Sequence, residues 1–306
     1  MSTVDSDPTA VAKVTMLDNV KEFLLRFAAS GLLPGSWFIP DRPKPEQLSA
    51  RSGSLSLEVV SHCWQYSHFL AYQLASIVKY PPNRCQLTFT LFYSGQDTKT
   101  VALLEQYRHL QVANVSWNFQ ELPTAHLLRR AIGRNQAAKA SSADWVWFTD
   151  CDVLFFENCF DSLAEQLQNR QDLLVFPRTL KATELLEADA TVLTEQVDLN
   201  TDISGSLFSL RHYKKATGPI QIVHGDVARQ CGYCDSLSVY QRPKPVWVKT
   251  YEDRAFRWLL GTDGIAIEID NLYLIRHVQK GRYQPTSRFS ALRRMNRRIK
   301  AALFNK

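Results

Sequence analysis

Between residues 55 and 275, short apolar runs alternate with segments in which apolar residues have helical spacing, and one further segment with helical spacing precedes them. Short apolar runs predict strands at residues 55–60, 86–92, 112–119, 145–149, 173–176, 206–210, 220–223, 265–269 and 272–275. Segments with helical spacing predict helices at residues 14–29, 65–78, 98–107, 124–141, 161–169, 224–231 and 251–260. A helix with a mobile loop is expected at residues 182–202. The alternation of strands and helices predicts an α/β fold with a doubly wound, mostly parallel sheet.

The strand at residues 145–149 leads into two carboxylates, Asp150 and Asp152, which are one residue apart. Its continuous apolar character is typical of a strand buried on both faces. Because side chains alternate along an extended chain, we expect both carboxylates to point to the same side. They would stay ionised most easily around a cation, and Mg²⁺ or Mn²⁺ prefers such oxygen ligands. The alternative is a solvated turn at the end of a strand.

The charge of the chain is unevenly distributed. The formal net charge is +6, yet no acidic residue follows Asp270, so the cations gather in the last part of the chain. Within it, residues 288–304 are expected to form a basic amphipathic helix. This helix could pack on the body of the protein, lie on an anionic membrane surface as a peripheral contact, or bind nucleic acid, the last being the least favoured.

Other features of composition narrow the class of protein. No apolar run approaches the ~20 residues that cross a bilayer, and the polar start of the chain is unlike a secretory signal. We therefore expect a cytoplasmic protein, with a possible position at the inner membrane face. The six cysteines are scattered, and the pair Cys231 and Cys234 has no second pair that would complete a zinc site.

Two further groups of polar residues accompany the paired acids. Arg130 and Arg134 lie one helical turn apart, and guanidinium groups on one face suit a diphosphate as well as an ordinary basic surface. Glu252 and Asp253 begin a predicted helix, where acids are also favoured by the helix dipole. His277 follows the last predicted strand and could be a metal ligand or a core histidine.

Taken in order, these segments resemble the GT-A fold glycosyltransferases, most closely those of family 2, which usually invert the sugar. The resemblance covers about residues 55–282. It rests on the segments Gly133-Arg134-Asn135, Asp150-Cys151-Asp152, Gly232-Tyr233-Cys234-Asp235, Thr250-Tyr251-Glu252-Asp253 and Leu274-Ile275-Arg276-His277. It implies a Rossmann-like, mostly parallel central sheet flanked by helices, with a smaller mixed region on the acceptor side. It also implies a hexosyltransferase that uses Mn²⁺ or Mg²⁺.

The resemblance also assigns roles to these residues. Asp152 would be the main metal ligand, Asp150 its partner and a contact of the donor, and His277 the completing ligand. Asp253, or else Glu252, would deprotonate the acceptor hydroxyl. The nucleotide-sugar donor would be held along its diphosphate by Arg130, Arg134, Asn135 and Arg282. Family members often read the nucleobase with an acid at the end of the second strand; here Tyr93-Ser94-Gly95-Gln96 stands there, and Asp97 is the nearest acid.

The expected reaction transfers a sugar from a UDP- or GDP-sugar to a hydroxyl of a glycan or lipid-linked acceptor. The expected organisation is an N-terminal helix and connector (1–54), a nucleotide-sugar-binding half (55–180), an acceptor-binding half (181–282) and a basic C-terminal helix (283–306). Two alternatives remain open: a phosphatase with an aspartate nucleophile, and a binding module without catalytic activity.

Overall fold

The computed structural model describes residues 33–39, 41–187, 190–194, 207–246 and 251–278, together with the positions 20, 24, 25 and 29. Most of the helix expected at residues 14–29 lies outside these residues, as do the basic segment 288–304 and Arg282. Within the described part of the chain, no helix combines the length and the apolar character needed to cross a membrane.

The central sheet has seven strands in the order β10-β6-β9-β4-β1-β2-β3. β2 is parallel to β1 and β3, β4 is parallel to β1, and β10 is parallel to β6, while β9 runs antiparallel between β4 and β6. The prediction of a mostly parallel sheet is therefore confirmed. The strands are β1 (Leu55–His62), β2 (Cys85–Tyr93), β3 (Val115–Glu121), β4 (Trp145–Phe148), β6 (Leu174–Pro177), β9 (Gln221–His224) and β10 (Ile265–Ile267).

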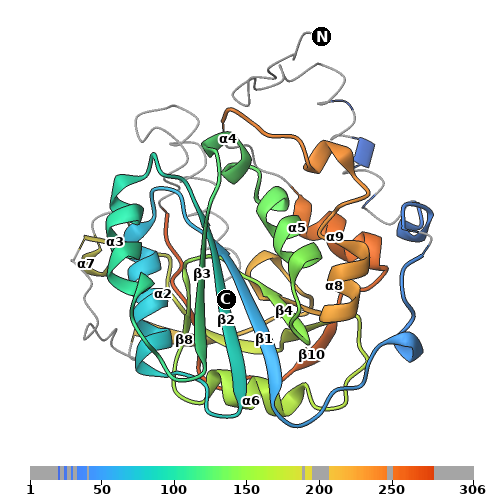
Figure 1. The fold of residues 1–306 in the computed structure, drawn as a ribbon, viewed down its shortest axis with the longest axis horizontal. Coiled ribbons are helices and arrows are strands. Elements are labelled where there is room, and N and C mark those ends of the chain that lie inside the picture. Colours follow the sequence, from blue (N-terminus) through green and yellow to red (C-terminus); the bar gives the residue numbers. More distant parts are fainter. Residues whose placement is uncertain are drawn as a thin grey trace, which may run out of the picture.

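Helices cover both faces of this sheet (Figure 1). Parallel strands are joined by right-handed crossovers. The chain moves outward from β1 to β3 through α2 and α3, and then returns to β4 through α5, so α5 lies on the face opposite to α2 and α3. α8 packs against α5. The helices are α2 (Ser67–Lys79), α3 (Thr98–Arg108), α4 (Thr124–Leu127), α5 (Arg130–Ala140), α6 (Cys159–Gln166), α7 (Thr191–Thr194), α8 (Gly225–Cys231) and α9 (Glu252–Leu260).

A second, mixed sheet has four strands in the order β5-β11-β7-β8. It explains two differences from the sequence-based expectations. The residues after Asp152 form β5 in this second sheet, where no strand was predicted. β7 begins before residue 182, where a helix and loop were expected, because it pairs with β8 and β11. The strands are β5 (Val153–Phe155), β7 (Thr179–Thr183), β8 (Phe208–His212) and β11 (Leu272–Leu274).

The helix expected at residues 124–141 is divided into α4 and α5. Arg129 stands between them with extended φ and ψ values of −107° and 87°. Its side chain is fully buried and donates a hydrogen bond of 3.0 Å to the carbonyl of Val239. Helical spacing in the sequence could not show this interruption, because the partner of Arg129 lies more than a hundred residues further along the chain.

Candidate active site

The paired aspartates lie where the central sheet ends and the second sheet begins. The chain turns after β4, and the amide of Val153 donates a 3.2 Å hydrogen bond to the carbonyl of Asp150. Residues 150–153 therefore form a turn rather than the extended chain on which the expectation of a common side was based. A turn is needed here because β4 and β5 belong to different sheets, and it directs the two carboxylates toward different partners.

The carboxylate of Asp150 faces α5. It accepts hydrogen bonds from Arg130 and, at 3.2 Å, from Nη2 of Arg134. Burial opposes the charge of Arg130, but the nearby carboxylates of Asp150 and Glu252 raise its pKa, so this guanidinium stays charged. The two arginines that share a helical face in the sequence thus converge on the first acid of the motif.

The two arginines differ in exposure. The side chain of Arg134 is 1% exposed, whereas that of Arg130 is 21% exposed. Arg134 also donates hydrogen bonds to the hydroxyl of Tyr233 (2.9 Å) and to the carbonyl of Thr149 (3.0 Å). Arg134 is therefore held among protein groups, and the side chain of Arg130 is the more exposed of the two.

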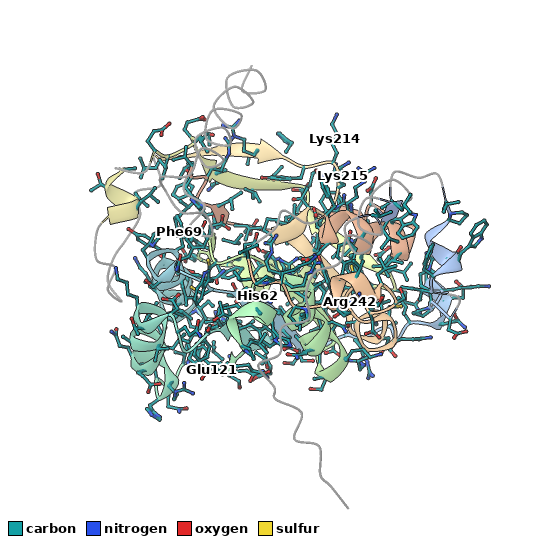
Figure 2. The ribbon with its side chains drawn as sticks, turned by 90° about the horizontal axis from the view of Figure 1, so that it is seen from above. His62, Phe69, Glu121, Lys214, Lys215 and Arg242 are labelled. Atoms are coloured by element: carbon teal, nitrogen blue, oxygen red, sulfur yellow. The ribbon has the colours of Figure 1, made fainter. Side chains whose placement is uncertain are left out.

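The carboxylate of Asp152 faces His277, with 3.6 Å between Oδ2 and Nε2. The two residues are brought together because Ile275, after β11, donates a 2.9 Å hydrogen bond to the carbonyl of Asp152. The ring of His277 lies 4.2 Å, between centroids, from that of Phe69 on α2, which is labelled in Figure 2. A carboxylate and an imidazole, far apart in sequence, are thus neighbours at the end of β4.

These two side chains fit a divalent cation only if further ligands come from outside the protein. Oδ1 of Asp152 is buried and has no hydrogen-bond partner within the described residues. The described part of the chain holds no group of three His, Cys, Asp or Glu side chains able to bind a metal ion alone. Mg²⁺ and Mn²⁺ sites commonly combine one or two protein ligands with substrate phosphates and water, so Asp152 and His277 suit an ion that arrives with a phosphorylated ligand.

The acids at the start of α9 have different surroundings. The side chain of Glu252 is 3% exposed, and its Oε1 lies 3.7 Å from Nη1 of the fully buried Arg129. Neither carboxylate oxygen of Glu252 has a hydrogen-bond partner among the described residues. The side chain of Asp253 is 36% exposed and lies 3.8 Å from that of Arg257. Asp253 is thus the more accessible of the two acids for a proton transfer.

The side chain of Asn135 is hydrogen-bonded to the turn that follows α8. Its side chain accepts a 2.9 Å hydrogen bond from the amide of Tyr233 and donates one of 2.7 Å to Asp235. Gly232 precedes Tyr233 and has a φ of 61°. A Cβ at this position would lie 2.2 Å from Oδ1 of Asn135. The glycine and the asparagine, both noted in the sequence, therefore fit each other.

Asp97 caps α3. Its carboxylate accepts hydrogen bonds from the amide of Gln65 (2.6 Å) and from the amide and hydroxyl of Thr100 (3.3 and 2.7 Å). These bonds join the beginning of α3 to the loop after β1. The carboxylate of Asp97 therefore stabilises the contact between α3 and the loop after β1.

The central residue of the motif, Cys151, is buried beside Cys63. The neighbouring thiol of Cys63, together with burial, raises the pKa of Cys151 well above its ordinary value. Cys151 therefore remains a neutral thiol and packs as a small apolar side chain.

Two side chains near Asp152, those of Arg276 and Tyr213, were not assigned a role from the sequence. Nη1 of Arg276, next to His277, is buried without a hydrogen-bond partner in the described residues. Burial raises the pKa of Tyr213, Arg276 lowers it and Asp152 raises it, which places all three side chains in one neighbourhood. The position of Arg276 in the segment that ends in His277 was the available signal.

With this geometry in view, the chain can be compared with known proteins. The model of the family described as Glycosyl transferase family 2 matches residues 67–208. The resemblance seen in the sequence is thereby confirmed. Residues 67–208 therefore match a family 2-like glycosyltransferase. This match includes the paired aspartates and α5, and it ends before the acids of α9 and His277. No curated protein sequence matches the chain significantly.

Several solved structures are similar to this chain at low identity. S. aureus TarS 1-349 aligns with 14% identity and a TM-score of 0.44, over 72% of this chain and 60% of that one. The same protein in complex with UDP-GlcNAc aligns with 13% identity and a TM-score of 0.44, over 76% and 61%. The mannosyltransferase PcManGT from Pyrobaculum calidifontis, in complex with GDP-Man and Mn²⁺, aligns with 14% identity and a TM-score of 0.44, over 92% and 76%. The chain thus spans about three fifths of the length of the TarS structures.

Proposed function

We propose that this protein transfers a sugar from a UDP- or GDP-sugar to an acceptor hydroxyl, with inversion and with the help of Mn²⁺ or Mg²⁺. The observation that carries the proposal is the pair of Asp152 and His277, 3.6 Å apart, with a buried carboxylate oxygen left open. This pair lies at the carboxyl end of a central parallel strand, where ligands of α/β sheets bind. Asp152 belongs to the segment that matches family 2, and His277 follows that segment.

In this proposal, Asp152 and His277 hold the cation, with Asp150 close by. When bound, the cation would offset the negative charge of a departing diphosphate. Arg130, whose side chain is 21% exposed and pairs with Asp150, contacts the donor diphosphate. Arg134 and Asn135 support this side of the site from within the protein. Arg282 lies outside the described residues and is retained as a further donor contact.

The acceptor hydroxyl needs a carboxylate that can reach it and take its proton. We assign this role to Asp253, because its carboxylate is partly exposed while that of Glu252 is enclosed with Arg129. Glu252 then orients the start of α9. The acceptor is a glycan or lipid-linked hydroxyl, and a peripheral membrane contact through residues 288–304 is part of the same proposal.

The alternative of a phosphatase with an aspartate nucleophile has less support. Such a mechanism would need Asp150 as the nucleophile, yet its carboxylate is hydrogen-bonded to two guanidinium groups. Charge-assisted hydrogen bonds stabilise a carboxylate and make it a poorer nucleophile. A binding module without activity is separated from the enzyme by the experiment below.

The test measures binding and turnover separately. Mn²⁺ with UDP, GDP and their sugars is titrated into the protein by calorimetry, and release of nucleoside diphosphate is followed with candidate acceptors. Asp152→Asn should abolish the Mn²⁺-dependent part of donor binding, since it removes the charged ligand. Asp253→Asn should leave donor binding unchanged and lower turnover by about a hundredfold or more.

Two results would contradict these assignments. Donor binding in the wild type that is independent of Mn²⁺ and Mg²⁺ would remove the cation from the proposal. Normal turnover by Asp253→Asn would exclude Asp253 as the base, and tight donor binding without any turnover in the wild type would favour the binding module.

A further inference from the structure

The side chain of Gln73 on α2 lies in the interior of the protein. The residue is 0% exposed, and so are Phe69 and Ile77, one turn before and after it on the same helical face. Burial of an amide among apolar side chains is costly unless its polar atoms are hydrogen-bonded. The partners of Gln73 therefore indicate what it contributes.

Those partners lie on the turn that carries the paired aspartates. Nε2 of Gln73 donates to the carbonyl of Asp150 at 3.0 Å and to the carbonyl of Val153 at 2.8 Å. Its Oε1 accepts a 3.0 Å hydrogen bond from the hydroxyl of Ser61, at the end of β1. Both amide hydrogens are thus engaged with the two ends of the Asp150–Val153 turn, and β1 fixes the orientation of the amide.

We propose that Gln73 is a positioning residue for the cation site. By binding the carbonyls of Asp150 and Val153, it holds the turn in the shape that presents the carboxylate of Asp152 to His277. Gln73 does not touch the ligand and acts only through the backbone. The proposal rests on the proposed function, because it takes Asp152 and His277 as the cation ligands.

The same helix face also supports the second ligand. Phe69 on α2 packs under the ring of His277, with 4.2 Å between the centroids. One turn later in α2, Gln73 binds the turn that carries Asp152. α2 therefore sets the distance between the two ligands, which come from segments more than a hundred residues apart. Groups that orient metal ligands in this way commonly change metal affinity by about 10- to 100-fold when they are removed.

α2 offers a matched control in Ser76. Its hydroxyl donates a 2.7 Å hydrogen bond to the carbonyl of Gln73 and accepts one of 3.1 Å from the amide of Phe155. Ser76 thus also joins α2 to β5, and it is also buried. However, its contact lies beyond the Asp150–Val153 turn. A purely structural loss should weaken Mn²⁺ binding alike in the Ser76 and Gln73 variants. Loss of positioning should weaken Mn²⁺ binding only in the Gln73 variant.

The experiment compares the full-length wild type, Gln73→Leu and Ser76→Ala. Binding of Mn²⁺ is measured by electron paramagnetic resonance titration, with and without UDP or GDP, and Tm is measured in parallel. We expect both variants to have a lower Tm. We expect Gln73→Leu to bind Mn²⁺ at least about tenfold more weakly, and Ser76→Ala to bind it within about twofold of the wild type.

Each outcome decides the proposal. Wild-type Mn²⁺ affinity in Gln73→Leu would overturn it and leave the proposed function intact. A wild type that binds no Mn²⁺, with or without a nucleotide, would overturn the proposed function and the positioning role together. If Gln73→Leu does not fold, Ser61→Ala replaces it. That variant removes only the hydrogen bond that orients the amide and should weaken Mn²⁺ binding severalfold, whereas an unchanged affinity would again overturn the proposal.

Discussion

Two neighbouring arginines show how strongly the surroundings of a residue decide its role. Arg130 and Arg134 have the same chemistry, the same helix and the same acidic partner, Asp150. Arg134 is enclosed, with cation–π contacts of 5.2 Å to Tyr233 and 5.9 Å to Phe148, while the side chain of Arg130 is 21% exposed. The sequence predicted that both share a helix face, but it could not show which of them faces the body of the protein.

Substitution of these arginines should separate stability from binding. Arg134→Leu should lower the free energy of unfolding by about 3 kcal/mol, because it leaves buried partners without their charged donor. Arg130→Gln should cost about 1 kcal/mol, because Asp150 keeps Arg134, but should weaken UDP or GDP binding about tenfold. Urea denaturation and calorimetric titration measure the two effects. Equal stability of the two variants would show that the difference in burial has no energetic consequence.

At the scale of elements, α5 reaches the sheet through small residues. Ala131, Gly133, Ala137 and Ala138 are buried in it, which permits a close approach of helix and strands. A Cβ added at Gly133 would lie 2.5 Å from Nε2 of His62 and 2.9 Å from the ring of Phe92. Those rings stack 5.2 Å apart, so neither can move without disturbing the other.

Gly133→Ala is therefore expected to destabilise the protein by about 1–3 kcal/mol through overpacking. The sign of this change in stability is informative, because at an exposed helical site alanine is more favourable than glycine by about 1 kcal/mol. Gln136→Ala, at an exposed position of the same helix, is the control and should be neutral or slightly stabilising. The comparison uses urea denaturation, and a stabilised Gly133→Ala would show that α5 does not pack as closely as described.

The elements themselves were largely predictable. Nearly every predicted strand and helix of residues 55–275 that the structure describes is present, with ends that shift by a few residues. The exceptions have tertiary causes. β7 forms because β8 and β11 flank it, and α4 and α5 separate because Arg129 turns inward toward Val239. Neither partner is near in sequence, so local spacing could not reveal them.

In the part of the chain that the structure describes, burial disfavours the protonated forms of His68 and His224. Burial, with the nearby His277 and Lys99, lowers the pKa of His68 from 6.5 to about 4. Burial also lowers the pKa of His224, whose Nδ1 accepts a 3.2 Å hydrogen bond from the amide of Asp226. Because these pKa values are lower in the folded state, the unfolded chain binds more protons between pH 6.5 and 4.

The free energy of unfolding should therefore be greatest above pH 6.5 and fall as the pH drops toward 4. From His68 we expect on the order of 1–2 kcal/mol, after allowance for its partial exposure. Urea denaturation of the metal-free protein at several pH values measures this, and the double variant His68→Gln, His224→Gln should show a flatter profile between pH 7 and 5. A wild-type stability that is constant over that interval would contradict the prediction.

The sequence by itself determined the α/β class, the order of strands and helices, and the place of Asp150 and Asp152 after the fourth predicted strand. These properties follow from local periodicity and from the composition of short segments. Only the tertiary structure decided that the two aspartates separate, Asp150 toward Arg130 and Asp152 toward His277, and that Gln73 supports the turn between them. The physical reason is that hydrogen bonding and burial between distant segments, rather than spacing along the chain, determine where a polar side chain points.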